Sequence, residues 1–165
     1  MLSRRLPTVI LASQSPARRM LLEQEGVEVI VRPTWAHEEH TITEAREVVT
    51  TLSRRKLEAA LAQNGGATLP LLACDTIIAI DGQLMGKPSS VEEARLQIKR
   101  LRSGVQEVWS AWALYRDGSI IGGADRAGAA GAYRIQGRGR SLIASIEGDE
   151  SVVIGLPLLQ MKRVL

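Results

Sequence analysis

Asp75 and Lys87 are the two charged residues whose setting most clearly suggests chemistry. An apolar run, 69–74, leads into Asp75 and the hydroxyl of Thr76. A second apolar run ends at an Asp-Gly pair, 81–82, which is a typical hairpin signal, and Lys87 follows just before a proline. The pattern predicts a buried strand that delivers a carboxylate to a sheet edge, a hairpin, and a return that delivers a lysine. An acid and a base on neighbouring strands can form a site for a charged substrate.

A serine-rich turn near the start of the chain predicts a second part of this site. Residues 8–12 read as a short strand, Ser15 is a good helix N-cap, and Pro16 is a good first helical residue. The free N–H groups at such a helix start can hold a phosphate, and Arg18 adds positive charge. The same residues fit about equally a plain strand–helix unit with surface arginines.

Acidic and basic residues between these segments offer further candidates. The cluster 37–40, His-Glu-Glu-His, lacks the spacing of a helical zinc motif, but a loop carboxylate there could hold Mg²⁺ through water. It fits equally a solvated polar loop. Residues 41–44 resemble a capping box for a long helix. That helix carries three adjacent cations, Arg54, Arg55 and Lys56, of which one could reach into a cleft.

The second half of the chain predicts one helix followed by strands. Residues 90–93 form another capping box, and 107–115 alternate as a strand that turns at 117–118 into a strand at 119–121. A small-residue region then extends to Gly131. We expect a strand over 141–146, a strand end at 152–156, and a last helix that begins at Pro157.

Composition bounds the class of protein. The chain has 165 residues and no long linker, which predicts a single domain over residues 1–165. The net charge of +3 favours an anionic partner such as a phosphate ester, without requiring nucleic acid. Aromatic residues make up only 3%, and Phe is absent, which argues against stacking platforms for bases.

The single cysteine and the apolar runs indicate the compartment. Cys74 cannot form an internal disulfide, so we expect a reducing environment, and we interpret Cys74 as a packing residue rather than a reactive thiol. The sequence shows no signal peptide and no apolar stretch of membrane-spanning length. We therefore expect a cytoplasmic protein without a membrane partner.

Three segments, taken together and in order, resemble one family. They are 11–22 with its serine-proline-arginine motif, 75–88 with Asp75 and Lys87, and 131–137 together with 147–149 and 153–158. This combination resembles the Maf proteins, described as nucleoside triphosphate pyrophosphatases and linked to septum formation. The resemblance implies a three-layer α/β fold with a twisted mixed sheet and a cleft between two lobes, as in inosine-triphosphate pyrophosphatases. It also implies cleavage between the α- and β-phosphates, a divalent metal (Mg²⁺ or Mn²⁺), and a homodimer.

The resemblance also implies roles for individual residues. Asp75 matches the proton acceptor, Lys87 a lysine near the phosphates, and Lys56 a cleft lysine; on chemical grounds Asp75 could also bind the metal. The loop glutamate falls on Glu38, or on Glu39 if one counts back from Lys56. The residues matched to substrate binding are Ser13, Ser15 and Arg18 for the phosphates, and Ala17, Thr76 and Gln136 for the base.

Two departures from the family pattern leave alternatives open. Ala17 stands where one subfamily has arginine and another tryptophan, while Thr76 and Gln136 resemble the subfamily acting on thymidine and uridine triphosphates. The spacing before Arg18 resembles the subfamily acting on methylated guanosine triphosphate. The region 121–131 is shorter than usual, which predicts a trimmed lobe. A nucleotide-binding regulator of cell division with weak catalysis is therefore the alternative to a pyrophosphatase.

Overall fold

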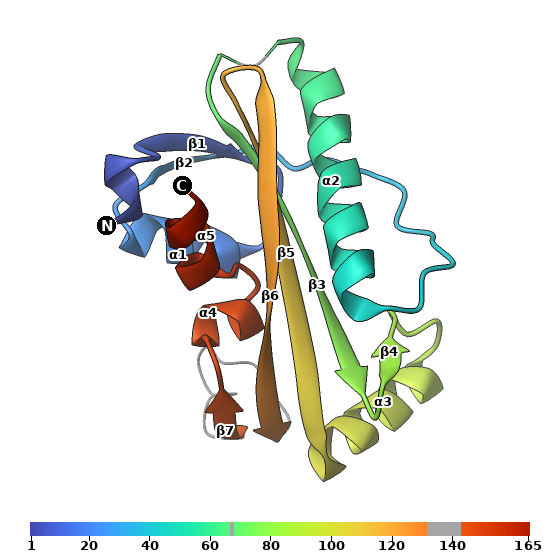
Figure 1. The fold of residues 1–165 in the computed structure, drawn as a ribbon. Helices are drawn as coiled ribbons and strands as arrows, with labels where there is room; N and C mark the ends of the chain where they lie inside the picture. Colours follow the sequence, from blue (N-terminus) through green and yellow to red (C-terminus); the bar gives the residue numbers. More distant parts are fainter. Residues whose placement is uncertain (67, 132–142) are drawn as a thin grey trace.

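The computed structural model describes residues 1–66, 68–131 and 143–165. Within these ranges the chain forms a seven-stranded sheet with helices on both faces (Figure 1). Its elements, in chain order, are η1 (Leu2–Arg4), β1 (Thr8–Leu11), α1 (Pro16–Gln24), β2 (Glu28–Val31), α2 (Ala45–Asn64), β3 (Leu71–Ile80), β4 (Gln83–Met85), α3 (Val91–Ser103), β5 (Val105–Arg116), β6 (Ser119–Gly131), β7 (Ile143–Glu147), α4 (Glu150–Ile154) and α5 (Leu158–Val164).

The sheet is mixed and twisted, as expected. Its strand order is β2-β1-β3-β5-β6-β7, with the short β4 paired to β3 off this path. β1 is parallel to both β2 and β3, whereas β3, β5, β6 and β7 pair antiparallel. The long strands β3, β5 and β6 run side by side through the middle of the molecule (Figure 1).

A gap along one edge of β3 matters most for function. β1 pairs with β3 only as far as Leu72, and β4 pairs with β3 only from Ile78 onward. Within the described chain, residues 73–77 of β3 therefore have a strand neighbour on one side alone, which is β5. Asp75 lies in the middle of this gap.

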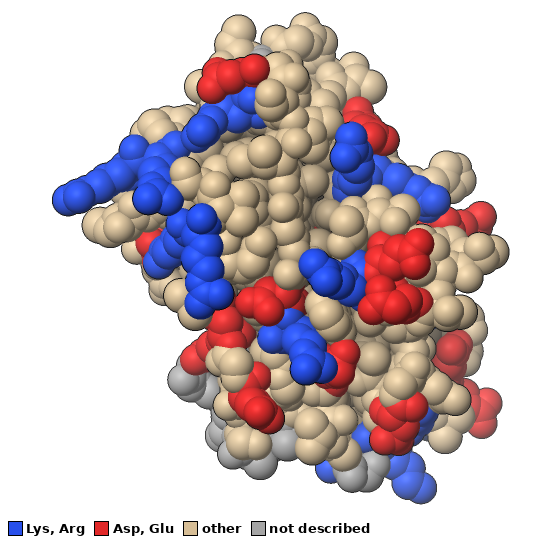
Figure 2. Space-filling model, viewed as in Figure 1, with Lys and Arg blue, Asp and Glu red and all other residues tan. Residues whose placement is uncertain are grey.

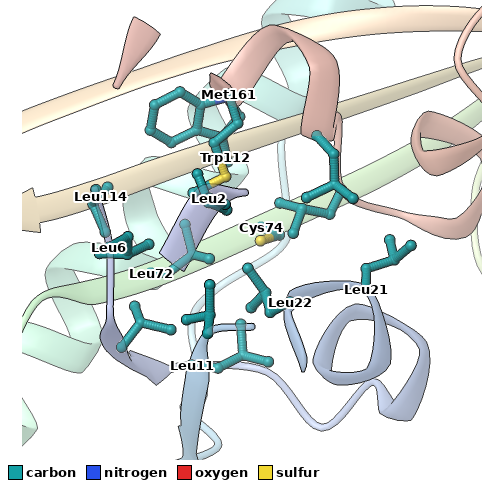
Figure 3. Close-up of a cluster of buried hydrophobic side chains, with 14 residues drawn as sticks. Leu2, Leu6, Leu11, Leu21, Leu22, Leu72, Cys74, Trp112, Leu114 and Met161 are labelled. Carbon is teal, nitrogen blue, oxygen red and sulfur yellow. The ribbon is translucent and has the colours of Figure 1, made fainter. Parts of the chain in front are cut away.

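Alternation along the central strands divides the core between the two faces of the sheet. One face packs against α1 and α5, and Figure 3 shows its buried cluster, which contains Cys74 and the fully buried Trp112. The other face packs against α2 through Leu57 and Ala60, which meet Leu71 and Ala73 of β3. The result is the three-layer arrangement, and the burial of Cys74 agrees with its interpretation as a packing residue.

Three local predictions are corrected by the structure. The small-residue region after 121 is one continuous strand, β6, because its backbone pairs with β5 along the whole length from Ser119 to Ala130. Residues 152–154 lie in a helix, α4, because the Asp149 side chain accepts a hydrogen bond from the Ser151 N–H and caps its start. The cap of α2 is likewise one turn later than predicted.

That cap is Glu44, whose carboxylate accepts hydrogen bonds from the backbone N–H groups of Arg46 and Glu47. The other helix starts agree with prediction, since Ser15 caps α1 and Ser90 caps α3. In the described ranges, no helix combines the length and the apolar character needed to cross a membrane.

Candidate active site

A cleft of about 840 Å³ opens at the gap along β3. Segments far apart in the sequence line it: the end of β1 and the turn after it, the loop between β2 and α2, the middle of α2, the gap in β3, and the residues after β4. The lining residues that the sequence had singled out are Ser13, Arg18, Glu38, Glu39, Lys56, Asp75, Thr76 and Lys87.

The acidic centre of the cleft is Asp75, held by Lys56. Asp75 is only 7% exposed and points from β3 toward α2. Lys56 comes from α2, and its Nζ lies 2.5 Å from Asp75 Oδ1. The side chain of Lys56 is 16% exposed, so this ion pair is shielded from solvent. Lys56 reaches β3 because the buried stripe of α2 packs its middle turns directly against that strand.

Glu38 links two lysines across the cleft. Its Oε1 lies 3.0 Å from Lys56 Nζ, and its Oε2 lies 2.5 Å from Lys87 Nζ. Lys87, from the loop after β4, and Lys56, from α2, therefore contact the same carboxylate. The Lys87 side chain is nevertheless 86% exposed. Glu39 lies beside it, and its backbone carbonyl accepts a hydrogen bond from Arg55.

The pKa values of the two carboxylates, Glu38 and Asp75, are shifted in opposite directions. Hydrogen bonds from Lys87 and then Lys56 lower the pKa of Glu38, so this group stays ionised. Burial raises the pKa of Asp75 above its usual value, and the attraction of Lys56 and Arg18 offsets this only in part. Asp75 is thus a stronger base than an exposed aspartate, which suits a group that accepts a proton near neutral pH.

Arg18 occupies the other face of the sheet from Asp75. Successive residues of β3 point to opposite faces, so Thr76 faces α1 while Asp75 faces α2. The Arg18 guanidinium donates to the carbonyl oxygens of Gly155 and Cys74 at 2.9 and 3.2 Å. It also donates to the hydroxyls of Ser13 and Thr76, each at 3.1 Å. The bond to Cys74 satisfies a carbonyl exposed by the gap in the sheet.

Other predicted site residues are placed differently. The Ser15 hydroxyl accepts from the Arg18 N–H as the helix cap, and neither Ser15 nor Ala17 lines the cleft. Gln136 lies outside the described residues. Sequence reasoning missed Ser110, a fully buried serine of β5 that bonds to the Thr76 hydroxyl. Its signal was a hydroxyl within the mainly apolar run 108–115 of that strand.

The acidic side chains fit a divalent metal of the expected kind. Glu38 and Asp75 both approach the Lys56 ammonium, so two carboxylates converge on one part of the cleft. Mg²⁺ and Mn²⁺ prefer oxygen ligands, and Mg²⁺ commonly uses one or two carboxylates together with water and substrate phosphates. Among the described residues, no group of three or more metal-ligating side chains forms a cage made by the protein alone.

Charge over the surface is mixed rather than of one sign. Figure 2 shows acidic and basic side chains next to one another over much of the viewed face. The net charge of +3 is a small excess of 21 basic over 18 acidic residues. The cleft is also mixed: Arg18, Lys56 and Lys87 converge on it from α1, α2 and the loop after β4, and they face three carboxylates, those of Glu38, Glu39 and Asp75.

The sequence matches a known family along nearly its whole length. The sequence model for the family described as Maf-like protein matches residues 8–126 and 119–165. The chain belongs to the Maf-like family. The two matched stretches overlap at 119–126, which includes the first part of the region 121–131 that the sequence predicts to be shortened.

Named relatives of this Maf-like chain are enzymes. A dTTP/UTP pyrophosphatase of Methylobacillus flagellatus is 33% identical over 180 residues, covering 95% of this chain and 90% of that protein. A nucleoside triphosphate pyrophosphatase of Gluconobacter oxydans is 34% identical over 189 residues, covering 96% and 93%. Both alignments are longer than the 165 residues of the chain, so the relatives have residues that this chain lacks.

A solved structure supports the fold. The Ham1 protein of Staphylococcus aureus superposes with a TM-score of 0.51, covering 82% of this chain and 79% of that one, at 14% sequence identity. At this low identity the likeness concerns the architecture alone. It confirms the mixed α/β fold that the sequence predicts.

Proposed function

We propose that this Maf-like chain is a nucleoside triphosphate pyrophosphatase, a hydrolase that converts a nucleoside triphosphate to the monophosphate and pyrophosphate in the cleft at the β3 gap. The observation that carries the proposal is the convergence of one buried acid, Asp75, with Arg18, Lys56 and Lys87 in a single cleft. The named activities of the relatives point to the same reaction.

Asp75 is the proton acceptor in this proposal. A water molecule attacks the α-phosphorus, its proton passes to an Asp75 oxygen, and the bond between the α-phosphorus and the bridging oxygen breaks. The raised pKa of Asp75 makes the carboxylate a better base. Lys56, at 2.5 Å, keeps one carboxylate oxygen fixed and leaves the other to face the water.

The cations bind the charge that moves during the reaction. Phosphoryl transfer depends mainly on positioning and electrostatic stabilisation, and a triphosphate carries several negative charges. Arg18 binds from the α1 side, and Lys56 and Lys87 bind from the α2 side. Glu38 contacts both lysines, so a bound triphosphate would compete with this carboxylate for the same two ammonium groups.

Glu38 and Asp75 are the proposed ligands of Mg²⁺ or Mn²⁺. When bound, the metal supplies charge neutralisation and alignment of phosphate oxygens. The depressed pKa of Glu38 keeps this carboxylate available as a ligand over a wide pH range. Glu39, the alternative loop carboxylate, lies next to it and also lines the cleft.

Thymidine and uridine triphosphates are the substrates that we propose first. The name of the Methylobacillus flagellatus relative supports this choice, as does Thr76, which lines the cleft and matches the corresponding subfamily. We further propose a cytoplasmic homodimer with a link to septum formation. Exposed apolar side chains of α3, such as Val91 and Leu96, support an interface between copies. Light scattering after gel filtration tests the dimer.

A triphosphate panel tests the activity. Purified protein is incubated with canonical and modified nucleoside triphosphates and Mg²⁺ or Mn²⁺, and released pyrophosphate is measured. We expect turnover by the wild type and a loss of about a hundredfold or more in Asp75→Asn. Absence of turnover with every triphosphate, or equal turnover by Asp75→Asn, would refute the proposal. Tight nucleotide binding without product would favour the regulator instead.

A further inference from the structure

Ser110 lies behind the phosphate-binding side of the cleft without lining it. It is 0% exposed and sits directly opposite Thr76 in the pairing of β3 with β5. Its Oγ lies 2.8 Å from the Thr76 Oγ1 and 2.7 Å from the carbonyl oxygen of Val152 in α4. A buried hydroxyl that bonds to a cleft residue on one side and to a helix carbonyl on the other can fix the orientation of the cleft residue's hydroxyl.

The direction of each hydrogen bond follows from the number of protons. The carbonyl of Val152 can only accept, so the single hydroxyl proton of Ser110 points to it. Ser110 must then accept from Thr76, whose own single proton is thereby committed to Ser110. Toward the cleft, Thr76 presents only lone pairs, and these accept from the Arg18 guanidinium at 3.1 Å.

Without the Ser110 hydroxyl, the orientation of the Thr76 hydroxyl would no longer be fixed. Among the described residues, the other acceptor for the Thr76 hydroxyl is the carbonyl oxygen of Gly155, at the longer distance of 3.5 Å. That same oxygen already accepts from Arg18 Nε at 2.9 Å. A freed Thr76 hydroxyl can therefore rotate so that its proton faces the Arg18 N–H, which places donor against donor. The guanidinium would lose one of its fixed contacts at the β3 gap.

We infer that Ser110 is a positioning residue that acts through Thr76 to hold the Arg18 guanidinium in the orientation that binds the substrate phosphates. This inference rests on the proposed pyrophosphatase function and deepens it. None of the hydrogen bonds of Arg18 to the described residues goes to β5, so Ser110 acts on Arg18 through Thr76. The inference predicts that loss of the Ser110 hydroxyl weakens phosphate binding and leaves the proton transfer at Asp75 unchanged.

The test compares Ser110 variants by KM and kcat for the best triphosphate. We expect Ser110→Ala to raise KM about tenfold, which is about 1.4 kcal/mol of binding, with kcat within about twofold of the wild type. Ser110→Thr keeps the hydroxyl and should keep KM within about twofold, even if the added methyl lowers stability. If Ser110→Ala does not fold, Ser110→Cys replaces it, because a thiol leaves no cavity, although it is larger than a hydroxyl, and is a poor hydrogen-bond acceptor.

Two controls separate positioning from a general structural effect. Ser53→Ala also removes a buried hydroxyl, one that bonds only locally to the Thr50 carbonyl in α2, and should leave KM unchanged. In a Thr76→Val background, Ser110→Ala should raise KM no further, because its route to Arg18 is already cut. An unchanged KM in Ser110→Ala, a rise in Ser53→Ala of equal size, or additive effects with Thr76→Val would overturn the inference.

Binding of inorganic pyrophosphate, measured by calorimetry, distinguishes this inference from the function on which it rests. If the wild type binds pyrophosphate but turns over no triphosphate, the proposed function fails. The inference then stands or falls on whether Ser110→Ala weakens that binding about tenfold. If the wild type binds neither pyrophosphate nor a triphosphate, the phosphate site itself is absent and both are refuted.

Discussion

Lys56→Met tests the electrostatic reasoning about the cleft most directly. The change removes the cation that lies 2.5 Å from Asp75 and 3.0 Å from Glu38, while methionine keeps most of the apolar stem. The Lys56 and Asp75 side chains are only 16% and 10% exposed, so the remaining carboxylate cannot regain full hydration. Breaking a buried ion pair by removing one partner costs about 3–5 kcal/mol. We expect the free energy of unfolding to fall by about 3 kcal/mol, near the lower limit of this range, because Arg18 also attracts Asp75.

The loss in Lys56→Met should depend on pH. Burial raises the pKa of Asp75 already in the wild type, and Lys56 opposes that rise, so its removal raises the pKa further. A carboxyl group with a higher pKa in the folded state destabilises that state as pH rises. Where Asp75 is ionised in the unfolded chain but protonated in the folded variant, stability falls by about 1.4 kcal/mol per pH unit. The deficit relative to wild type should be small in acid, where Asp75 is protonated in both proteins, and should grow as the pH rises above the usual aspartate range.

Urea unfolding followed by tryptophan fluorescence at several pH values measures this deficit. The matched control is the double variant Lys56→Met, Asp75→Asn, which removes the buried charge together with its partner. We expect the double variant to be more stable than Lys56→Met near about pH 8, because no unpaired carboxylate remains. An equal deficit at every pH, or a double variant that is no more stable than the single one, would refute the reasoning.

Three further predictions concern the metal, the base and the sheet. Glu38→Gln should raise the Mg²⁺ concentration needed for half-maximal activity about tenfold or more, and Glu39→Gln should not; a larger effect at Glu39 would reassign the ligand. The acid limb of kcat/KM against pH should lie above the usual aspartate range, because burial raises the pKa of Asp75, and a limb within that range would contradict it. Gly122→Ala should cost about 2 kcal/mol in urea unfolding, because its Cβ would lie 2.6 Å from a backbone oxygen of β5, whereas Gly104→Ala, with open space, should be nearly neutral.

Much of the fold could be predicted because local signals and tertiary structure agree. Ser15 and Ser90 cap the helices that they predict, and the Asp-Gly pairs at 81–82 and 117–118 form the hairpin turns, with positive φ at both residues of each pair. The two faces of β3 also follow from its alternation. In each case a few neighbouring residues carry the information.

The errors arose where long-range pairing decides the structure. The glycines and alanines after 121 have weak strand propensity, and only the full ladder with β5 makes them a strand. Residues 152–154 are β-branched and apolar, which favours a strand, but the Asp149 cap and the packing of Val152 make them helical. Local propensity could not show which tertiary contacts these residues would make.

The candidate site was predictable in its residue types but not in its partners. Asp75 and Arg18 stood out as charged residues next to an apolar run and a serine-rich turn, and Lys56 as one of three adjacent cations on a long helix. That Lys56 rather than Arg54 or Arg55 reaches β3 depends on the rotation of α2 over the sheet. Ser110 was missed because its role depends on the register that sets it opposite Thr76.

The shortened region does not reach the cleft, and the topology explains why. β6 is separated from β3 by β5, and the residues of the described chain that line the cleft all lie between Ala12 and Lys87 in the sequence. What β6 supplies is an unbroken ladder along β5, including the pair Ser110 and Asp125 behind the site. β5 in turn fixes the gap segment of β3, which has no other strand neighbour in the described chain. A shorter connection that keeps this ladder continuous therefore leaves the geometry of Asp75 and Thr76 intact.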